Sequence, residues 1–302
     1  MKIFCVLVLS LGLICSLAFS WGSATHVYMY EQLKKMGAIP NTNAIYGVMA
    51  PDVFNYMFPQ WALTDKLYDL THHDFMEFWG AQNNQKDRSL GYGFVAHNDS
   101  WGMDSTAHHE ARTLGSGNPG YVMQRAGWLY GLGVGAMLQS PPFNLSFSTA
   151  QEICHELIES AIDLMIKQVD PNLPAKLISA AAGTDKNFLD LLFQAYSPFL
   201  MNSPFSLDAT SIRAIIGQND AGFRYAINAL GTALKKKYPQ DINAVAEQLA
   251  GVAGAAFGVS VDTAQVAYLL TLAMSCCPDY LNEVNATVGF VANQLKSHNI
   301  VK

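Results

Sequence analysis

The segment 91–109 contains three side chains whose types and spacing suit a metal ion. His97, Asp104 and His108 are separated by seven and then four residues. On a continuous α-helix these offsets place all three within about 20° of one another, on one stripe, whereas Asp99 points to the opposite side. Two imidazoles and a carboxylate suit a borderline cation such as zinc. The alternative is a helix whose polar residues face solvent, and a glycine inside the segment weakens the helix prediction.

Further histidines and carboxylates lie on both sides of this segment. His155 and Glu159 are an i, i+4 pair in a strongly helical stretch rich in apolar residues, so a partly buried pair there needs a partner such as a cation. His72 and His73 are adjacent, and because adjacent residues do not share a helical face, only one is expected to be a ligand. Asp52 follows a proline, a pattern that also fits a carboxylate at a helix N-terminus.

The first residues of the chain have the pattern of an export signal. Lys2 is the only charge before a run, residues 3–19, that is almost wholly apolar, and small residues precede a cleavage position after Ser20. The run is near the minimum needed to span a bilayer, so a membrane anchor is the alternative. Cleavage leaves Trp21 at the N-terminus, where its amine and carbonyl could chelate a metal close to His26. We therefore expect a secreted or periplasmic protein.

Composition and pattern predict an all-α protein. Of 302 residues, 50% are hydrophobic and 14% are charged, which is enough for a sizeable core. Helical patterns recur along the chain without a convincing strand pattern. The net charge of −6 argues against a protein that wraps long nucleic acid. We expect three parts: a signal peptide at 1–20, a metal-site region at 21–170, and a helical region at 175–302 that packs on it.

The order of the candidate ligands resembles that of the zinc-dependent phospholipase C and single-strand nuclease superfamily. Seven of the eight histidines lie between His26 and His155, and the resemblance covers about the first half of the mature chain. That family has an all-helical fold with three zinc ions, a mature N-terminal tryptophan, five histidines and two or three carboxylates. The corresponding residues here are Trp21, His26, Asp52, His72 or His73, His97, Asp104, His108, His155 and Glu159.

The resemblance implies three zinc ions, each held by its own set of ligands. The first set is the amine and carbonyl of Trp21, His26 and Asp104. The second set is Asp52, His72 or His73, His97 and Asp104. The third set is His108, His155 and Glu159. In this arrangement Asp104 bridges the first two ions.

The chain also departs from the family pattern. The family usually places its aspartate four residues after the central histidine, and this chain has Trp101 there. Asp104 comes one turn later, so Asp99 remains an alternative bridging ligand. The long helical extension at 175–302 is unlike the compact phospholipases, and the sequence assigns it no role.

The resemblance implies a zinc-dependent phosphoric ester hydrolase that acts as a phospholipase C, with Asp52 and Asp104 as its catalytic carboxylates. The spacing from Trp21 to His26 is closer to the nuclease branch, so a single-strand nuclease or nucleotidase is the second hypothesis. A secreted helical protein that holds zinc without catalysis is the third. The expected partner is a phospholipid or another phosphodiester, with transient contact to a membrane surface; nucleic acid is the weaker candidate.

Overall fold

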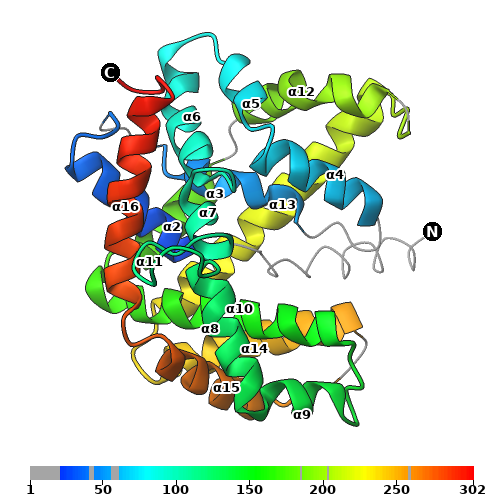
Figure 1. The fold of residues 1–302 in the computed structure, drawn as a ribbon. Coiled ribbons are helices and arrows are strands. Elements are labelled where there is room, and N and C mark those ends of the chain that lie inside the picture. Colours follow the sequence, from blue (N-terminus) through cyan, green and yellow to red (C-terminus); the bar gives the residue numbers. More distant parts are fainter. Residues whose placement is uncertain (1–20, 41–43, 56–60, 184–185, 203, 258–259) are drawn as a thin grey trace.

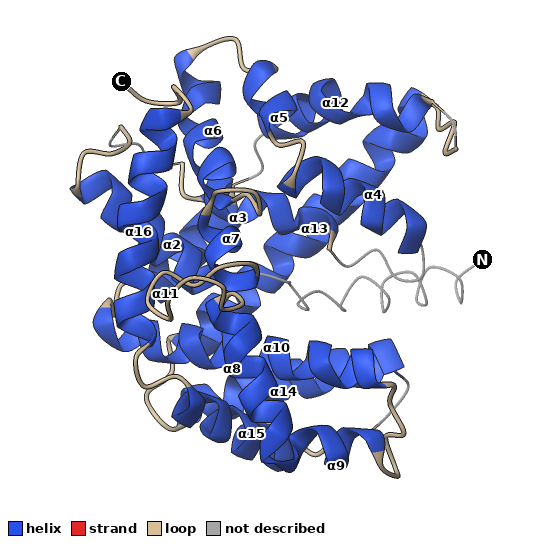
Figure 2. Ribbon diagram, viewed as in Figure 1, coloured by secondary structure: helices blue, strands red, loops and turns tan. Residues whose placement is uncertain are grey.

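The computed structural model shows a protein built from helices (Figures 1 and 2). The predicted signal peptide at 1–20 lies outside the described residues, which are 21–302 without 41–43, 56–60, 184–185, 203 and 258–259. This described part of the chain contains no strand, which confirms the all-α prediction. Within the same residues, no helix combines the length and the apolar character needed to cross a membrane.

The metal-site region consists mainly of short helices, followed by one long helix. The elements are α2 (Ser23–Lys35), α3 (Tyr46–Met49), η1 (Ala50–Phe54), α4 (Trp61–His72), α5 (Met76–Gly80), α6 (Gln85–His97), α7 (Met103–His108), α8 (Tyr121–Leu129), η2 (Tyr130–Val134), α9 (Gly135–Gln139) and α10 (Phe147–Val169).

The C-terminal region consists mainly of longer helices. They are α11 (Leu173–Ala182), α12 (Lys186–Met201), α13 (Ala209–Leu234), α14 (Gln240–Phe257), α15 (Thr263–Cys276) and α16 (Tyr280–Ser297). Side chains cap several of the long helices: Ser146 accepts a hydrogen bond from the N–H of Thr149 at the start of α10, and Asp208 accepts one from Ser211 at the start of α13. Such caps satisfy N–H groups that have no partner within the helix.

The two regions share one hydrophobic core. Buried apolar residues from Trp21 to Ile300 form a single cluster, so the boundary predicted near residue 170 does not separate two cores. The C-terminal helix α16 packs against α2 and α7, α15 packs against α8 and α10, and α13 packs against η1. The helices that carry the candidate ligands are therefore held from outside by helices of the C-terminal region (Figure 1).

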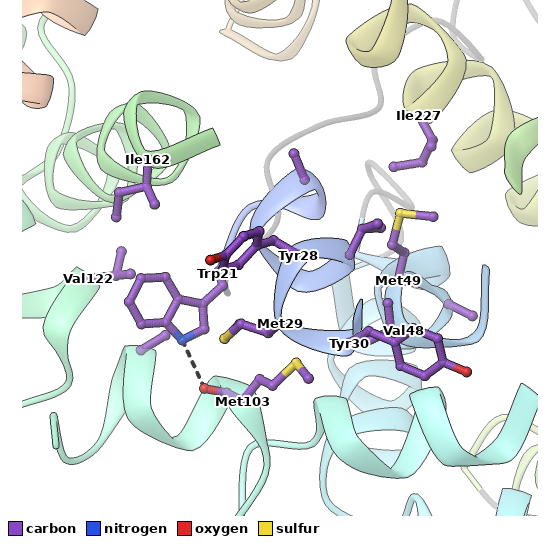
Figure 3. Packing of buried hydrophobic residues seen from close by; sticks show 14 of the residues in the cluster. Trp21, Tyr28, Met29, Tyr30, Val48, Met49, Met103, Val122, Ile162 and Ile227 are labelled. Atoms are coloured by element: carbon purple, nitrogen blue, oxygen red, sulfur yellow. Dashed lines mark hydrogen bonds between the residues drawn. The ribbon is translucent and has the colours of Figure 1, made fainter. Parts of the chain in front are cut away.

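Trp21 anchors the beginning of the described chain in this core (Figure 3). Its side chain is fully buried beside Val122 and Ile162, and its indole N–H donates to the backbone carbonyl of Met103 over 3.0 Å. The indole also stacks on Tyr121, with 5.7 Å between ring centroids. These contacts fix the start of α2 against Met103, the first residue of α7. The same helix carries the predicted ligand Asp104.

Candidate metal centre

Four predicted ligands meet in one buried group, which we call the first group. One ligand atom from each residue lies within 4.8 Å of the others, and every member is at most 1% exposed. Four different helices supply them, so the group exists only when these helices pack together. The members are Asp52 from η1, His72 from α4, His97 from α6 and Asp104 from α7.

The closest contacts in the first group join imidazole nitrogens to carboxylate oxygens. Nε2 of His97 lies 2.8 Å from Oδ2 of Asp104 and 3.5 Å from Oδ1 of Asp52. Nε2 of His72 lies 3.3 Å from the same oxygen of Asp52 and 3.7 Å from Oδ2 of Asp104. The two Nε2 atoms are 3.3 Å apart. Four possible ligand atoms therefore surround one small volume.

Hydrogen bonds on the opposite side of each ring determine what these nitrogens can do. Nδ1 of His97 lies 2.7 Å from the carbonyl oxygen of Val48, and Nδ1 of His72 lies 3.1 Å from that of Tyr68. A carbonyl oxygen only accepts, so Nδ1 of His97 is a donor. Nδ1 of His72 has a second neighbour, the hydroxyl oxygen of Thr71 at 2.9 Å, and it donates to the carbonyl in the tautomer that leaves Nε2 free. Nε2 is then left with a lone pair that can bind a proton or a metal ion. Metal-binding histidines are commonly oriented by such a bond.

The charge balance of the first group favours a cation. Burial by itself would raise the pKa of Asp52 and of Asp104, but the charges and hydrogen bonds of the surrounding histidines hold both pKa values below the ordinary range. Burial lowers the pKa of His97, yet these two carboxylates raise it well above that of a free imidazole. One proton on His97 leaves two buried carboxylates only partly balanced, whereas a divalent cation balances them fully.

His26 joins this group at the second oxygen of Asp104. Its Nε2 lies 2.9 Å from Oδ1 of Asp104, and its ring stacks on His97 with 4.2 Å between centroids. Its Nδ1 is buried and has no hydrogen-bond partner among the described residues. The nitrogen of Trp21 is a peptide nitrogen here because Ser20 precedes it, so the full predicted ligand set of this ion depends on the predicted cleavage.

Asp163 of α10 fixes the helix that carries His26. Its carboxylate accepts hydrogen bonds from the backbone N–H of Ala24 at 3.0 Å and of Thr25 at 2.8 Å, at the start of α2. The approach is close, because a Cβ atom on Gly22 would lie only 2.6 Å from this carboxylate. Asp163 was not among the predicted site residues, although it lies one helical turn beyond Glu159, a periodicity that could have indicated it.

Three other predicted ligands form a second group. One ligand atom of each of His108, His155 and Glu159 lies within 4.8 Å of the others. Nε2 of His155 is 2.9 Å from Oε1 of Glu159, and the rings of His108 and His155 are 5.4 Å apart. Nδ1 of His108 lies 2.9 Å from Oδ1 of Asp99, and Nε2 of His108 is buried without a hydrogen-bond partner in the described part of the chain. Each of the two groups could hold a metal ion.

The continuous helix predicted over 91–109 is wrong. The chain leaves α6 after its last residue and turns before α7, because the side-chain oxygen of Asn98 accepts hydrogen bonds from three successive N–H groups at 2.8–3.1 Å. Gly102 is required in this turn, since a Cβ atom there would lie 2.5 Å from a backbone oxygen. The turn, and not a shared helical stripe, brings Asp104 to the first group. His108, at the other end of α7, lies in the second group.

Two residues that were considered as ligands lie outside both groups. His73 is 42% exposed, and its Nε2 lies 4.0 Å from Oδ2 of Asp99. Asp99 does not point away from the site, as the helical stripe predicted; it is 5% exposed and contacts His108 as well as the exposed His109. Of the adjacent histidine pair, His72 is therefore the member placed in a group. Asp99 contacts a member of the second group without belonging to either group.

Sequence reasoning also missed Glu156, which lies between the two ligands of α10. Its side chain is buried, and its Oε1 has no hydrogen-bond partner among the described residues. Burial, together with the negative charges of Glu159, Glu152 and Asp52, raises the pKa of Glu156 well above its ordinary value. The signal for it was the cluster of acidic residues on an otherwise apolar helix, which is unusual for a buried face.

Comparison of the chain with protein-family models, with curated proteins and with solved structures found no match. The resemblance to the phospholipase C and nuclease superfamily rests on the identity and order of the candidate ligands.

Proposed function

We propose that the protein is a secreted zinc-dependent hydrolase of phosphoric esters, of the phospholipase C type. The observation that carries the proposal is the pair of Nε2 atoms of His72 and His97, 3.3 Å apart. Both rings are oriented through Nδ1, and both Nε2 atoms face two buried carboxylates. Neutral imidazoles with carboxylates are a donor set that zinc accepts.

The two groups supply ligands for more than one ion. The first group and the second group each suit one zinc ion, and the third ion implied by the resemblance would use His26, Asp104 and the amine of Trp21 after cleavage. Asp104 suits a bridging position, since one of its oxygens faces His26 and the other faces His97. Its two oxygens could then serve two neighbouring ions.

Zinc ions bound at these positions would lower the pKa of a water molecule and stabilise negative charge on the phosphoryl oxygens. The protein contributes the orientation of the groups around that water. Asp52 is held by the side-chain amide of Asn55, which donates to its Oδ1 over 2.9 Å. A carboxylate fixed in this way can orient an attacking water, which lowers the entropic part of the barrier.

The second group favours catalysis over a purely structural role. Structural zinc sites are normally closed by four protein ligands, whereas catalytic sites keep a position open. The second group offers three ligands, and one of them, Glu159, also lines a cavity of about 500 Å³. An open coordination position next to a cavity is where a phosphoryl group would bind.

Zinc content and product release test this proposal together. Purified protein whose chain begins at Trp21 is expected to contain bound zinc and to release phosphocholine from a soluble short-chain phosphatidylcholine. Removal of the metal should stop the release, and returning zinc should restore it. Release of nucleotides from single-stranded DNA instead would favour the nuclease hypothesis. Zinc without either activity would favour a structural zinc protein, and protein without zinc would contradict the proposal.

A further inference from the structure

One cavity lies between the metal-site region and the C-terminal region. Its volume is about 500 Å³, which is within the range of small-molecule sites. Helices α13 and α14, which pack against each other, form its walls, and α10 with the start of α2 forms its floor. The region 175–302, for which we predicted no role, thus supplies most of the residues around a cavity that one member of the second group, Glu159, also lines.

The walls of this cavity are mainly apolar. Alanines, Tyr225 and the polar side chains of Thr232, Lys236, Glu247 and Gln248 also line the cavity, and six lining residues have large hydrocarbon side chains, three from α13 and three from α14. They are Phe223, Ile227, Leu230, Val245, Leu249 and Val252. The hydrocarbon part of this surface removes an alkyl chain from water.

The floor of the cavity has the opposite character. One face of α10 contributes Glu156, Glu159, Ser160 and Asp163 at helical spacing. Asp163 accepts hydrogen bonds from the start of α2, and Glu159 belongs to the second group. Glu156 is only 5% exposed, and its Oε1 has no hydrogen-bond partner among the described residues. The floor therefore contains a buried carboxyl oxygen, Oε1 of Glu156, that no described residue hydrogen-bonds.

A cavity with apolar walls and a polar floor next to a metal ligand fits an amphiphile. We propose that this cavity binds the alkyl or acyl chain of a substrate whose phosphoryl group lies at the second group, so that α13 and α14 determine chain specificity. The inference rests on the proposed function for the position of the phosphoryl group. An anionic head beside Glu159 needs positive charge to offset the acidic floor; the proposed zinc provides it, and Lys236 also lines the cavity.

Binding of n-alkylphosphonates to the zinc-loaded protein tests the inference without catalysis, because their carbon–phosphorus bond is not a phosphoric ester. Calorimetry with butyl, hexyl and octyl members should show affinity that rises about fourfold for each added methylene. An affinity that does not depend on chain length would overturn the inference, while zinc content and phosphocholine release would still test the proposed function. If the affinity depends on chain length but the protein hydrolyses no phosphoric ester, the cavity binds an alkyl chain and the proposed function is wrong.

Gly251 allows the cavity to be filled with little risk to the fold. It lines the cavity, and a Cβ atom placed on it meets no other atom within 4 Å. Gly251→Trp should weaken octylphosphonate by roughly 16- to 60-fold, the equivalent of two to three methylenes, and leave butylphosphonate unchanged. Gly217→Trp is the matched control, because Gly217 lies on α13, has equally open surroundings and does not line the cavity.

A second variant changes the polarity of the wall and does not fill the space. Leu249→Asn places an amide among the apolar residues of α14 and should flatten the increase in affinity with chain length. If both Gly251→Trp and Leu249→Asn retain the full chain-length dependence of the unmodified protein, the chain does not lie in this cavity and the inference is wrong.

Discussion

Asp99 accepts a hydrogen bond from Nδ1 of His108 over 2.9 Å, and this contact joins a residue outside both groups to a member of the second group. The carboxylate is 5% exposed, so water screens the interaction little. With its proton fixed on Nδ1, His108 presents Nε2, which is buried beside His155 and Glu159. Asp99 therefore selects the tautomer that a metal in the second group requires.

The first prediction concerns this contact. Asp99→Asn keeps the size of the side chain but removes its charge, and it should weaken metal binding in the second group about 10–100-fold. Competition with a chromophoric chelator measures that affinity directly. Asp74→Asn is the control, because Asp74 is exposed and belongs to neither group. Equal zinc affinity in both variants would show that Asp99 does not orient a metal ligand.

The adjacent histidines give a second prediction. His72 faces the first group, whereas His73 is 42% exposed and belongs to neither group. His72→Asn should lower the zinc content by about one ion per chain, because an amide is a poor zinc ligand. His73→Asn should keep the zinc content of the unmodified protein. Elemental analysis of the two purified variants decides the point, and the reverse result would contradict the assignment.

The local patterns of the sequence predicted the helices but not how they meet. The i, i+4 spacing of His155 and Glu159 is a property of one helix, and the structure places both in the second group. The choice between His72 and His73 depends on where α4 ends, and α4 ends at His72. Helix ends are the least reliable part of a sequence-based prediction, because capping and packing decide them.

Asp104 lies beside His97, as we predicted, although the continuous helix from which we predicted it does not exist. We predicted a continuous helix over 91–109, but Asn98 ends that helix and a turn leads the chain to α7. The side chain of Asn98 competes with the helical backbone for hydrogen bonds, which asparagine does well. The cavity between α10, α13 and α14 could not be predicted, since it depends on contacts between helices far apart in the sequence.

A third prediction concerns the N-terminus. Only cleavage after Ser20 frees the amine of Trp21, which the proposed third ion would use together with His26. A chain that begins at Trp21 should therefore bind about one more zinc ion than a chain extended by a single methionine. Elemental analysis of both forms is the measurement. If the extended form has the same zinc content and the same activity, the amine is not a ligand.

Metal removal should lower thermal stability. The first group holds two carboxylates in a fully buried place, and their charges lose their main compensation when a cation leaves. Each ion present at a thousand times its Kd contributes about 4 kcal/mol, so stripping two ions should lower the Tm by on the order of 15 °C. Calorimetry with and without a chelator measures the shift. An unchanged Tm together with complete loss of zinc would show that the groups are stable without metal.

Asp104 is predicted to be the most sensitive single position of the site. Its Oδ1 lies 2.9 Å from His26, and its Oδ2 lies 2.8 Å from His97, so one carboxylate contacts two sets of candidate ligands. Loss of an ordinary ligand weakens one ion, whereas loss of a bridging carboxylate weakens two and leaves positive charge uncompensated between them. Asp104→Asn preserves the shape and removes the charge, so it isolates this effect.

We expect Asp104→Asn to lower the zinc content by more than one ion per chain and to reduce phosphodiester hydrolysis below detection. Asp99→Asn, in contrast, should keep measurable turnover, because the side chain of Asp99 contacts one member of the second group. Its contact with the first group is a backbone N–H that donates to the carbonyl oxygen of His72 over 3.1 Å, and the substitution leaves this bond in place. Zinc content and hydrolysis rate measured on both variants compare the two roles under the same conditions. An inactive Asp99→Asn beside an active Asp104→Asn would mean that Asp99 is the bridging residue and that the first group, as arranged here, is not the catalytic one.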